Sequence, residues 1–95
     1  MSATVDDWLV YILKCADGSL YTGISTDVER RLQEHERGLR GAKYLRGKGP
    51  LRLEYQHHIG DRSVASQAEF HVKRLDRRDK EELIAGNRSL SELLP

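Results

Sequence analysis

Residues 11–23 read YILKCADGSLYTG, and they carry an Asp-Gly pair between two runs of β-branched and aromatic residues. These runs cover residues 8–14 and 19–25, and an Asp-Gly pair between such runs is a strong hairpin signal. The stretch therefore predicts two antiparallel strands joined by a tight turn. It opens on one tyrosine and carries a second near its end, so the pairing of the strands decides whether the two rings share a face.

Two registers compete for this hairpin. A two-residue loop of Asp17-Gly18 pairs residues whose numbers sum to 35, whereas a three-residue loop with Gly18 in the left-handed position gives a sum of 34. A shift of one residue moves every side chain to the other face of the sheet. We favour the sum of 34, because it gathers one nearly apolar face: Trp8, Val10, Ile12, Leu20, Thr22 and Ile24.

The opposite face of the favoured hairpin carries both tyrosines. Tyr11 then lies directly opposite Gly23 and diagonally across from Tyr21. A glycine opposite an aromatic residue leaves room for another group to approach. We therefore expect this second face to form the floor of a site.

The residues after the hairpin predict helices around a third strand. Thr26 and Glu29 form a capping box, which predicts a helix that ends near Arg37. Residues 51–59 alternate as a strand does. A long helix is predicted over residues 64–78, with Asp61 or Ser63 as its N-cap. A further helix is predicted over 79–85 and a short helical turn over 89–94.

This order of elements predicts an α+β fold with a small three-stranded antiparallel sheet flanked by helices. The chain of 95 residues has the size of a single domain, so we expect one domain over residues 1–95 with its core at about 8–85. On a helical wheel, Glu69 flanks the apolar stripe of the second predicted helix.

The composition favours a water-soluble protein. Hydrophobic residues make up 38% of the chain and charged residues 33%, and no apolar run approaches the roughly 20 residues that a membrane helix needs. The acidic N-terminus does not resemble a signal peptide. Cys15 is the only cysteine, so no internal disulfide can form, and we expect a cytoplasmic location.

The net charge of +1 conceals one concentrated basic segment. No acidic residue interrupts the stretch 37–52, and glycines are interspersed along it. Such a segment suits a phosphate backbone, because affinity there comes from neutralising charge and releasing counterions. Its basic residues are Arg37, Arg40, Lys43, Arg46, Lys48 and Arg52.

The sequence resembles the GIY-YIG nuclease superfamily. The tripeptides LVY (9–11) and YTG (21–23) resemble its two signatures, although Leu9 stands where the first signature names glycine. The stretch TDVERRLQEH (26–35) resembles the first helix of that family, and AEFHVK (68–73) resembles the helix that carries its metal ligand. The resemblance covers about residues 8–85 and is nearest to the small stand-alone bacterial members.

The resemblance implies a sheet-and-helix fold and hydrolysis of DNA phosphodiester bonds with one divalent ion, Mg²⁺ or Mn²⁺, in DNA repair or processing. It also implies the roles of the site residues. These are Tyr11 as general base or water-positioner, Tyr21 orienting the phosphate or the water, Arg31 stabilising the transition state, His35 assisting or replacing Tyr11 as base, and Glu69 binding the metal. Contacts to DNA are expected from Gly23, Lys73 and the basic segment, where Arg37, Arg40, Lys43, Arg46 and Lys48 are the candidates.

Two other classes of function fit the same residues. A nucleic-acid-binding module could keep the nuclease fold without cutting its ligand. A small structural protein could contact RNA through its basic segment, and it would then depend on Arg40, Lys43 and Arg46 but not on Glu69.

Overall fold

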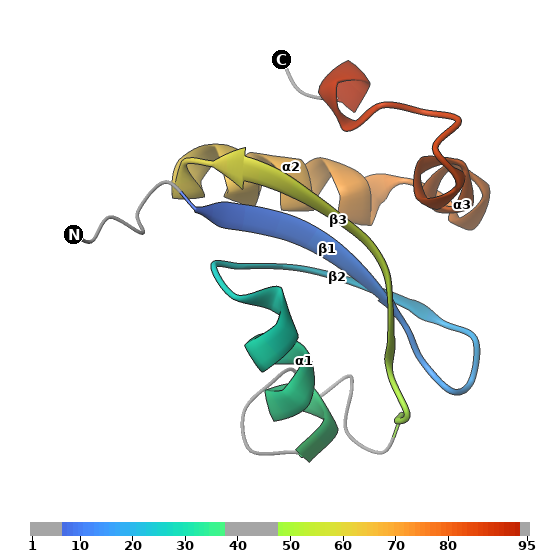
Figure 1. Ribbon diagram of the computed structural model, residues 1–95. Coiled ribbons are helices and arrows are strands. Elements are labelled where there is room, and N and C mark those ends of the chain that lie inside the picture. The colour runs from blue at the N-terminus through green and yellow to red at the C-terminus, as the bar shows by residue number, and fades with distance from the viewer. Residues whose placement is uncertain (1–6, 38–47, 94–95) are drawn as a thin grey trace.

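A computed structural model describes residues 7–37 and 48–93 of the chain. Figure 1 shows one antiparallel sheet with strand order β2-β1-β3 and helices on both sides of it. The elements are β1 (Trp8–Lys14), β2 (Leu20–Ser25), α1 (Val28–Arg37), β3 (Arg52–Gly60), α2 (Arg62–Arg74), α3 (Arg77–Ala85) and a 3₁₀ helix, η3 (Leu90–Leu93). This arrangement confirms the predicted α+β fold with its three-stranded antiparallel sheet.

The hairpin has the register with a sum of 34. Val10 pairs with Ile24 and Tyr11 pairs with Gly23. The loop between the strands has three residues, and Gly18 takes a left-handed backbone conformation with φ of 89°. The amide of Gly18 donates a hydrogen bond of 2.9 Å to the carbonyl of Cys15, which closes the turn. Both tyrosines therefore share a face, as predicted.

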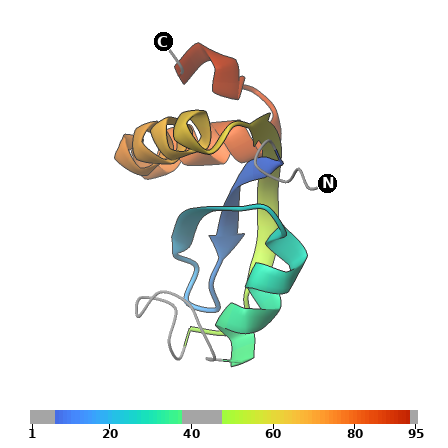
Figure 2. The same ribbon diagram turned by 90° about the vertical axis from the view of Figure 1, so that its left-hand side faces the viewer.

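Helices cover both faces of the sheet. Figures 1 and 2 show α2 and α3 on one side and α1 on the other. On the first side, Val10 and Ile12 pack with Ala68, Val72 and Leu83 in one hydrophobic core. A second core lies on the side of α1, formed by Tyr11, Leu13, Cys15, Val28 and Leu51. The second face, which we expected to form the floor of a site, is therefore covered by α1.

The first helix is capped one residue later than predicted. The side chain of Asp27 accepts a hydrogen bond of 3.0 Å from the amide of Arg30, and the Ser25 hydroxyl accepts one of 2.9 Å from the amide of Asp27. Asp27 therefore caps α1 in place of Thr26. The predicted end of this helix at Arg37 is confirmed.

The predicted helix 64–78 is interrupted. Asp61 caps α2, as one of the two alternatives had it, but the helix ends at Arg74 because Leu75 is extended, with ψ of 148°. Asp76 then accepts a hydrogen bond of 2.8 Å from the amide of Asp79 and starts α3. Within the described ranges, none of the helices is long and apolar enough to cross a membrane.

The ring of Tyr11 lies against the backbone of Gly23. A Cβ atom added at Gly23 would stand 2.5 Å from Tyr11 Oη and 2.7 Å from Cζ, both far inside van der Waals contact. The room that a glycine leaves in this sheet is thus filled by the tyrosine itself. Gly23 is required because no larger residue fits beneath this ring.

We expect Gly23→Ala to lower the free energy of unfolding by about 1–3 kcal/mol, because the methyl group forces the buried Tyr11 ring to move. Urea denaturation monitored by circular dichroism measures the change. Gly49→Ala is the matched control, since a Cβ there meets no atom within 4 Å. In a Tyr11→Phe background the cost at Gly23 should shrink, because the closest atom is then gone. An unchanged stability of Gly23→Ala would contradict this account of the packing.

Candidate active site

Three side chains from three elements meet on the face that α1 covers. The hydroxyl of Tyr11 on β1 forms a buried hydrogen bond of 3.3 Å with Nε2 of His35 on α1. The ring of Tyr21 on β2 meets the His35 ring edge-on, with centroids 5.8 Å apart and planes at 74°. The hairpin register places both tyrosines toward α1, and His35 is the residue of α1 that lies between them.

Arg31 lies one turn before His35 on the same helix. Its Nη1 atom is 3.2 Å from Oε1 of Glu34, and its side chain is about one third exposed. Its charge and hydrogen bonding both act on the Tyr11 hydroxyl, where they lower the pKa. Arg31 is therefore partly exposed to solvent and also acts on the buried hydroxyl of Tyr11. Glu34 was missed as a site residue, although its spacing of three from Arg31 was a readable signal.

Glu69 reaches the same region from α2. Its carboxylate also acts on the hydroxyl of Tyr11, where it raises the pKa, and it forms an ion pair of 3.2 Å with Lys73. The side chain of Glu69 is partly exposed, as its predicted place beside the apolar stripe of α2 requires. The structure therefore brings Tyr11, Tyr21 and His35 into direct contact, with Arg31 one helical turn before His35, whereas Glu69 on α2 is linked to them only through the effect of its charge on Tyr11.

Glu69 is the carboxylate of the five predicted catalytic residues, so it is the candidate ligand for a divalent ion. Among residues 7–37 and 48–93 no group of three or more His, Cys, Asp and Glu side chains comes together. Mg²⁺ does not need such a group, because it keeps several waters and is bound through one or two carboxylates together with substrate phosphates. A single, partly exposed carboxylate fits that mode of binding. A cation held by Glu69 would compete with the ammonium group of Lys73, which lies 3.2 Å from the carboxylate.

Burial shifts the pKa values of Tyr11 and His35 in opposite directions. It raises the pKa of Tyr11 to about 12, helped by the nearby Tyr21 and Glu69 and opposed by Arg31. Burial also lowers the pKa of His35, with Arg31 adding to the effect and Glu34 opposing it. Tyr11 is therefore protonated and His35 neutral near pH 7. The Nδ1 atom of His35 is buried without a hydrogen-bond partner in the described part of the chain.

The predicted contacts to nucleic acid are only partly described. Arg40, Lys43 and Arg46 lie outside the described residues. Arg37 is exposed at the end of α1, and Lys48 forms an ion pair of 3.0 Å with Asp17 in the hairpin turn. Gly23 lies beneath the Tyr11 ring, and Lys73 is held by Glu69.

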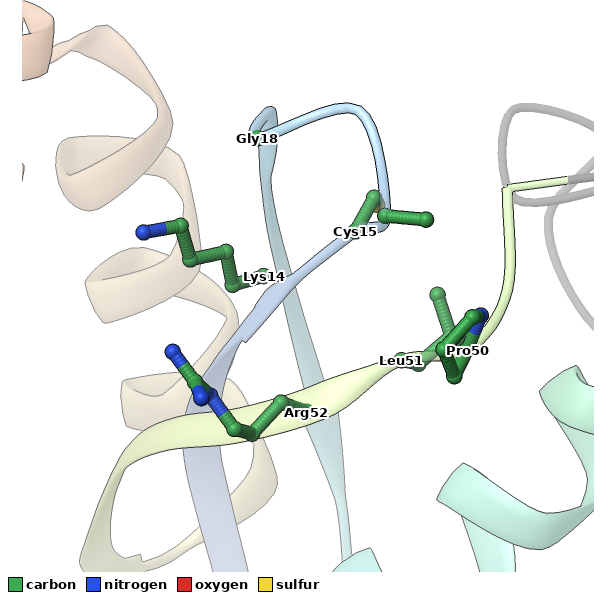
Figure 3. A pocket seen from close by; sticks show the side chains of 7 residues that line it. Lys14, Cys15, Gly18, Pro50, Leu51 and Arg52 are labelled. Carbon is green, nitrogen blue, oxygen red and sulfur yellow. The ribbon is translucent and has the colours of Figure 1, made fainter.

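A separate hollow of about 440 Å³ lies at the turn of the hairpin. Figure 3 shows the hairpin turn on one side of it and the start of β3 on the other, with Cys15, Gly18, Pro50 and Leu51 on its walls. None of the predicted catalytic residues lines it. The site therefore does not coincide with this hollow.

Fold and site together define a GIY-YIG domain. Residues 7–82 match the GIY-YIG catalytic domain family, and the chain belongs to that family. It is 53% identical over 87 residues to the UPF0213 protein YhbQ of Escherichia coli O139:H28 (strain E24377A / ETEC), covering 92% of this chain and 86% of that protein. The YhbQ protein of Shigella boydii serotype 18 gives the same identity and coverage.

A solved structure agrees with this assignment. The solution NMR structure of the UPF0213 protein BH0048 from Bacillus halodurans is 49% identical to this chain and superimposes with a TM-score of 0.54, over 82% of each chain. The family, the three-stranded sheet and the resemblance to small stand-alone bacterial proteins are therefore confirmed. The family consists of nucleases, so its substrates are nucleic acids.

We expect the imidazole of His35 to titrate below its ordinary pKa of about 6.5. The folded state favours the neutral ring, so unfolding takes up a proton near the lowered pKa. The stability that His35 contributes is thus complete above pH 6.5 and is lost as the pH falls through the folded-state pKa. Urea denaturation from pH 8 to pH 5, compared with His35→Gln, measures the difference. All other residues are the same in both proteins, so the difference isolates the contribution of His35. An NMR titration that gives His35 a pKa above 6.5 would overturn this expectation.

Proposed function

We propose that the protein is a divalent-metal-dependent endonuclease that hydrolyses phosphodiester bonds in DNA, in DNA repair or processing in the cytoplasm. The observation that carries the proposal is the buried contact of 3.3 Å between Tyr11 and His35. The charges of Arg31 and Glu69 act on that same hydroxyl. Membership of a nuclease family supports the class of reaction.

The hydrogen bond between Tyr11 and His35 supplies a path for the proton of the attacking water. With a pKa of about 12, Tyr11 is not ionised near neutral pH and does not act as a base by itself. In the proposed step, the water gives its proton to Tyr11 Oη while the tyrosine passes its own proton to Nε2 of His35. The tyrosine stays neutral throughout, and His35 is the final acceptor. This path requires the tautomer of His35 that carries its hydrogen on Nδ1.

Arg31 and a metal ion held by Glu69 would stabilise the negative charge that develops on the phosphate. A phosphate oxygen would take the place of Glu34 against the Arg31 guanidinium, whose fork matches two oxygens at once. Glu69 would hold Mg²⁺ or Mn²⁺, which supplies a Lewis acid that neutralises charge on the leaving oxygen. Tyr21 packs edge-on against the His35 imidazole and would hold that imidazole in place against Tyr11.

We expect Glu69→Gln and Arg31→Lys each to lower the rate of cleavage at least about 100-fold, since each removes a group that acts on developing charge. The measurement is cleavage of labelled single-stranded, duplex, flapped and branched DNA with Mg²⁺ or Mn²⁺. Glu81→Gln is the matched control, because Glu81 pairs with Arg77 at the same helical spacing as Glu69 with Lys73. Undiminished cutting by both site variants would refute the mechanism.

We expect Tyr11→Phe and His35→Gln to lower the cleavage rate by similar factors, and the double variant to be little worse than either. Residues that move one proton as a unit are not additive. If Tyr11 were the base alone, His35→Gln would retain most of the activity. Single-turnover rates of the three variants, each checked for folding by circular dichroism, separate the two schemes.

The same DNA panel decides between the nuclease and the binding module. A module without catalysis would show salt-sensitive affinity and no turnover with either metal on any form of DNA. If RNA binding is lost in variants of Arg40, Lys43 and Arg46 but kept in Glu69→Gln, the protein is instead the small structural protein that contacts RNA through its basic segment.

A further inference from the structure

A second cleft opens beside Arg31, at the end of the sheet where β1 begins and β2 ends. Its volume is about 340 Å³, the size of a site for one small ligand. The cleft lies between the first turns of α1 and α2, which approach from opposite faces of the sheet. Its lining residues are Trp8, Ile24, Ser25, Thr26, Arg30, Arg31, Glu34 and Arg62.

The aromatic wall of this cleft is a tryptophan with a guanidinium on it. The Cζ atom of Arg62 lies 5.0 Å from the centroid of the Trp8 ring. Trp8 is half-buried and Arg62 is exposed, so the pair faces solvent. Aromatic rings and arginine side chains are the surfaces on which unstacked bases lie in nucleic-acid complexes.

The opposite wall of the cleft carries excess positive charge. Arg30 and Arg31 both face the carboxylate of Glu34, at 3.9 Å and 3.2 Å. One carboxylate cannot neutralise two guanidiniums, and Arg62 adds a third on the far wall. The side chain of Arg30 is two thirds exposed and lies at the longer distance from Glu34, so it is the one most readily given to an incoming phosphate.

We propose that this cleft is a subsite for one unpaired nucleotide next to the bond that is cut. The base stacks at the Trp8–Arg62 pair, and its phosphate binds Arg30 in exchange for Glu34. Arg31 lines the cleft and lies one helical turn before His35, which is hydrogen-bonded to Tyr11, so the subsite lies beside the candidate active site. The inference rests on the proposed function and narrows its substrate class. A base inside a duplex is stacked and paired, so the preferred substrate has an unpaired nucleotide at this position.

Trp8 is the only tryptophan of the chain, so its fluorescence reports directly on the cleft. The experiment titrates a short oligothymidylate into the full chain carrying Glu69→Gln, without divalent metal, so that no cutting occurs. We expect the fluorescence to be quenched on binding, and a blunt duplex of equal length to bind more weakly. Fluorescence anisotropy of labelled DNA gives the affinity independently of Trp8.

The variants separate the two halves of the subsite. Trp8→Ala and Arg62→Ala should each weaken binding about tenfold, whereas Trp8→Phe, which keeps a stacking ring, should bind nearly as the parent does. Arg30→Ala should reduce the slope of log affinity against log salt by about 0.7, the value for one lost phosphate contact on a single strand. Glu34→Gln should tighten binding. Arg78→Ala, on the exposed part of α3 at the far end of α2, is the matched control and should change nothing.

Each result decides one of the two proposals. Unchanged affinity in Trp8→Ala and Arg62→Ala, or equal quenching by duplex DNA, overturns the subsite even if the protein with Glu69 intact cuts DNA. Quenching of Trp8 fluorescence in the parent, together with loss of affinity in these variants, supports the subsite even if no DNA is ever cut, in which case the endonuclease proposal fails alone.

Discussion

The contact of the Tyr11 ring with the backbone of Gly23 is the constraint on which the site depends. The glycine leaves room for the hydroxyl end of the ring against β2, and the hydroxyl then reaches His35 at 3.3 Å. Only the hairpin register with a sum of 34 puts these two residues opposite each other. A shift of the hairpin register by one residue would turn Tyr11 toward α2, and both the second hydrophobic core and the site would be lost. Stability and chemistry are thus linked through one pair of residues.

The burial that stabilises this packing also sets the protonation of the site. It keeps Tyr11 protonated and His35 neutral, which is the combination that a proton relay needs at its start. The proposed relay would end with a charged imidazole, whose neighbours act on it in opposite senses. Arg31 disfavours that charge, whereas Glu34 favours it. A phosphate that binds Arg31 would offset the unfavourable charge, so substrate binding and the basicity of His35 are coupled in this arrangement.

Much of the fold could be predicted from the sequence, because its signals are local. The Asp-Gly turn and the apolar alternation around it determined the register, and the cap at Asp61 and the predicted helix end at residue 85 match helix ends that the structure has. The covering of the second face was not predicted, because it depends on the direction that the chain takes after Ser25. The interruption at Leu75 was missed because the apolar stripe continues through that residue. The pair of Trp8 and Arg62 joins a strand to a helix far away in sequence, and no periodicity indicates it.

The place of the site in the sheet explains why so small a domain can gather five polar groups. β1 is the central strand, so α1 and α2 approach it from opposite faces, and β2 is an edge strand that leaves their first turns exposed to one side. Arg31 and Glu69 come from different faces, yet both act on Tyr11. A nucleotide bound as proposed would therefore reach the site from the end of the sheet where β1 begins and β2 ends, past Trp8 and Arg62. Stacking and phosphate contacts carry almost no sequence information. In the proposed mechanism, the site therefore selects nucleic acids by whether a nucleotide is unpaired and not by the order of the bases.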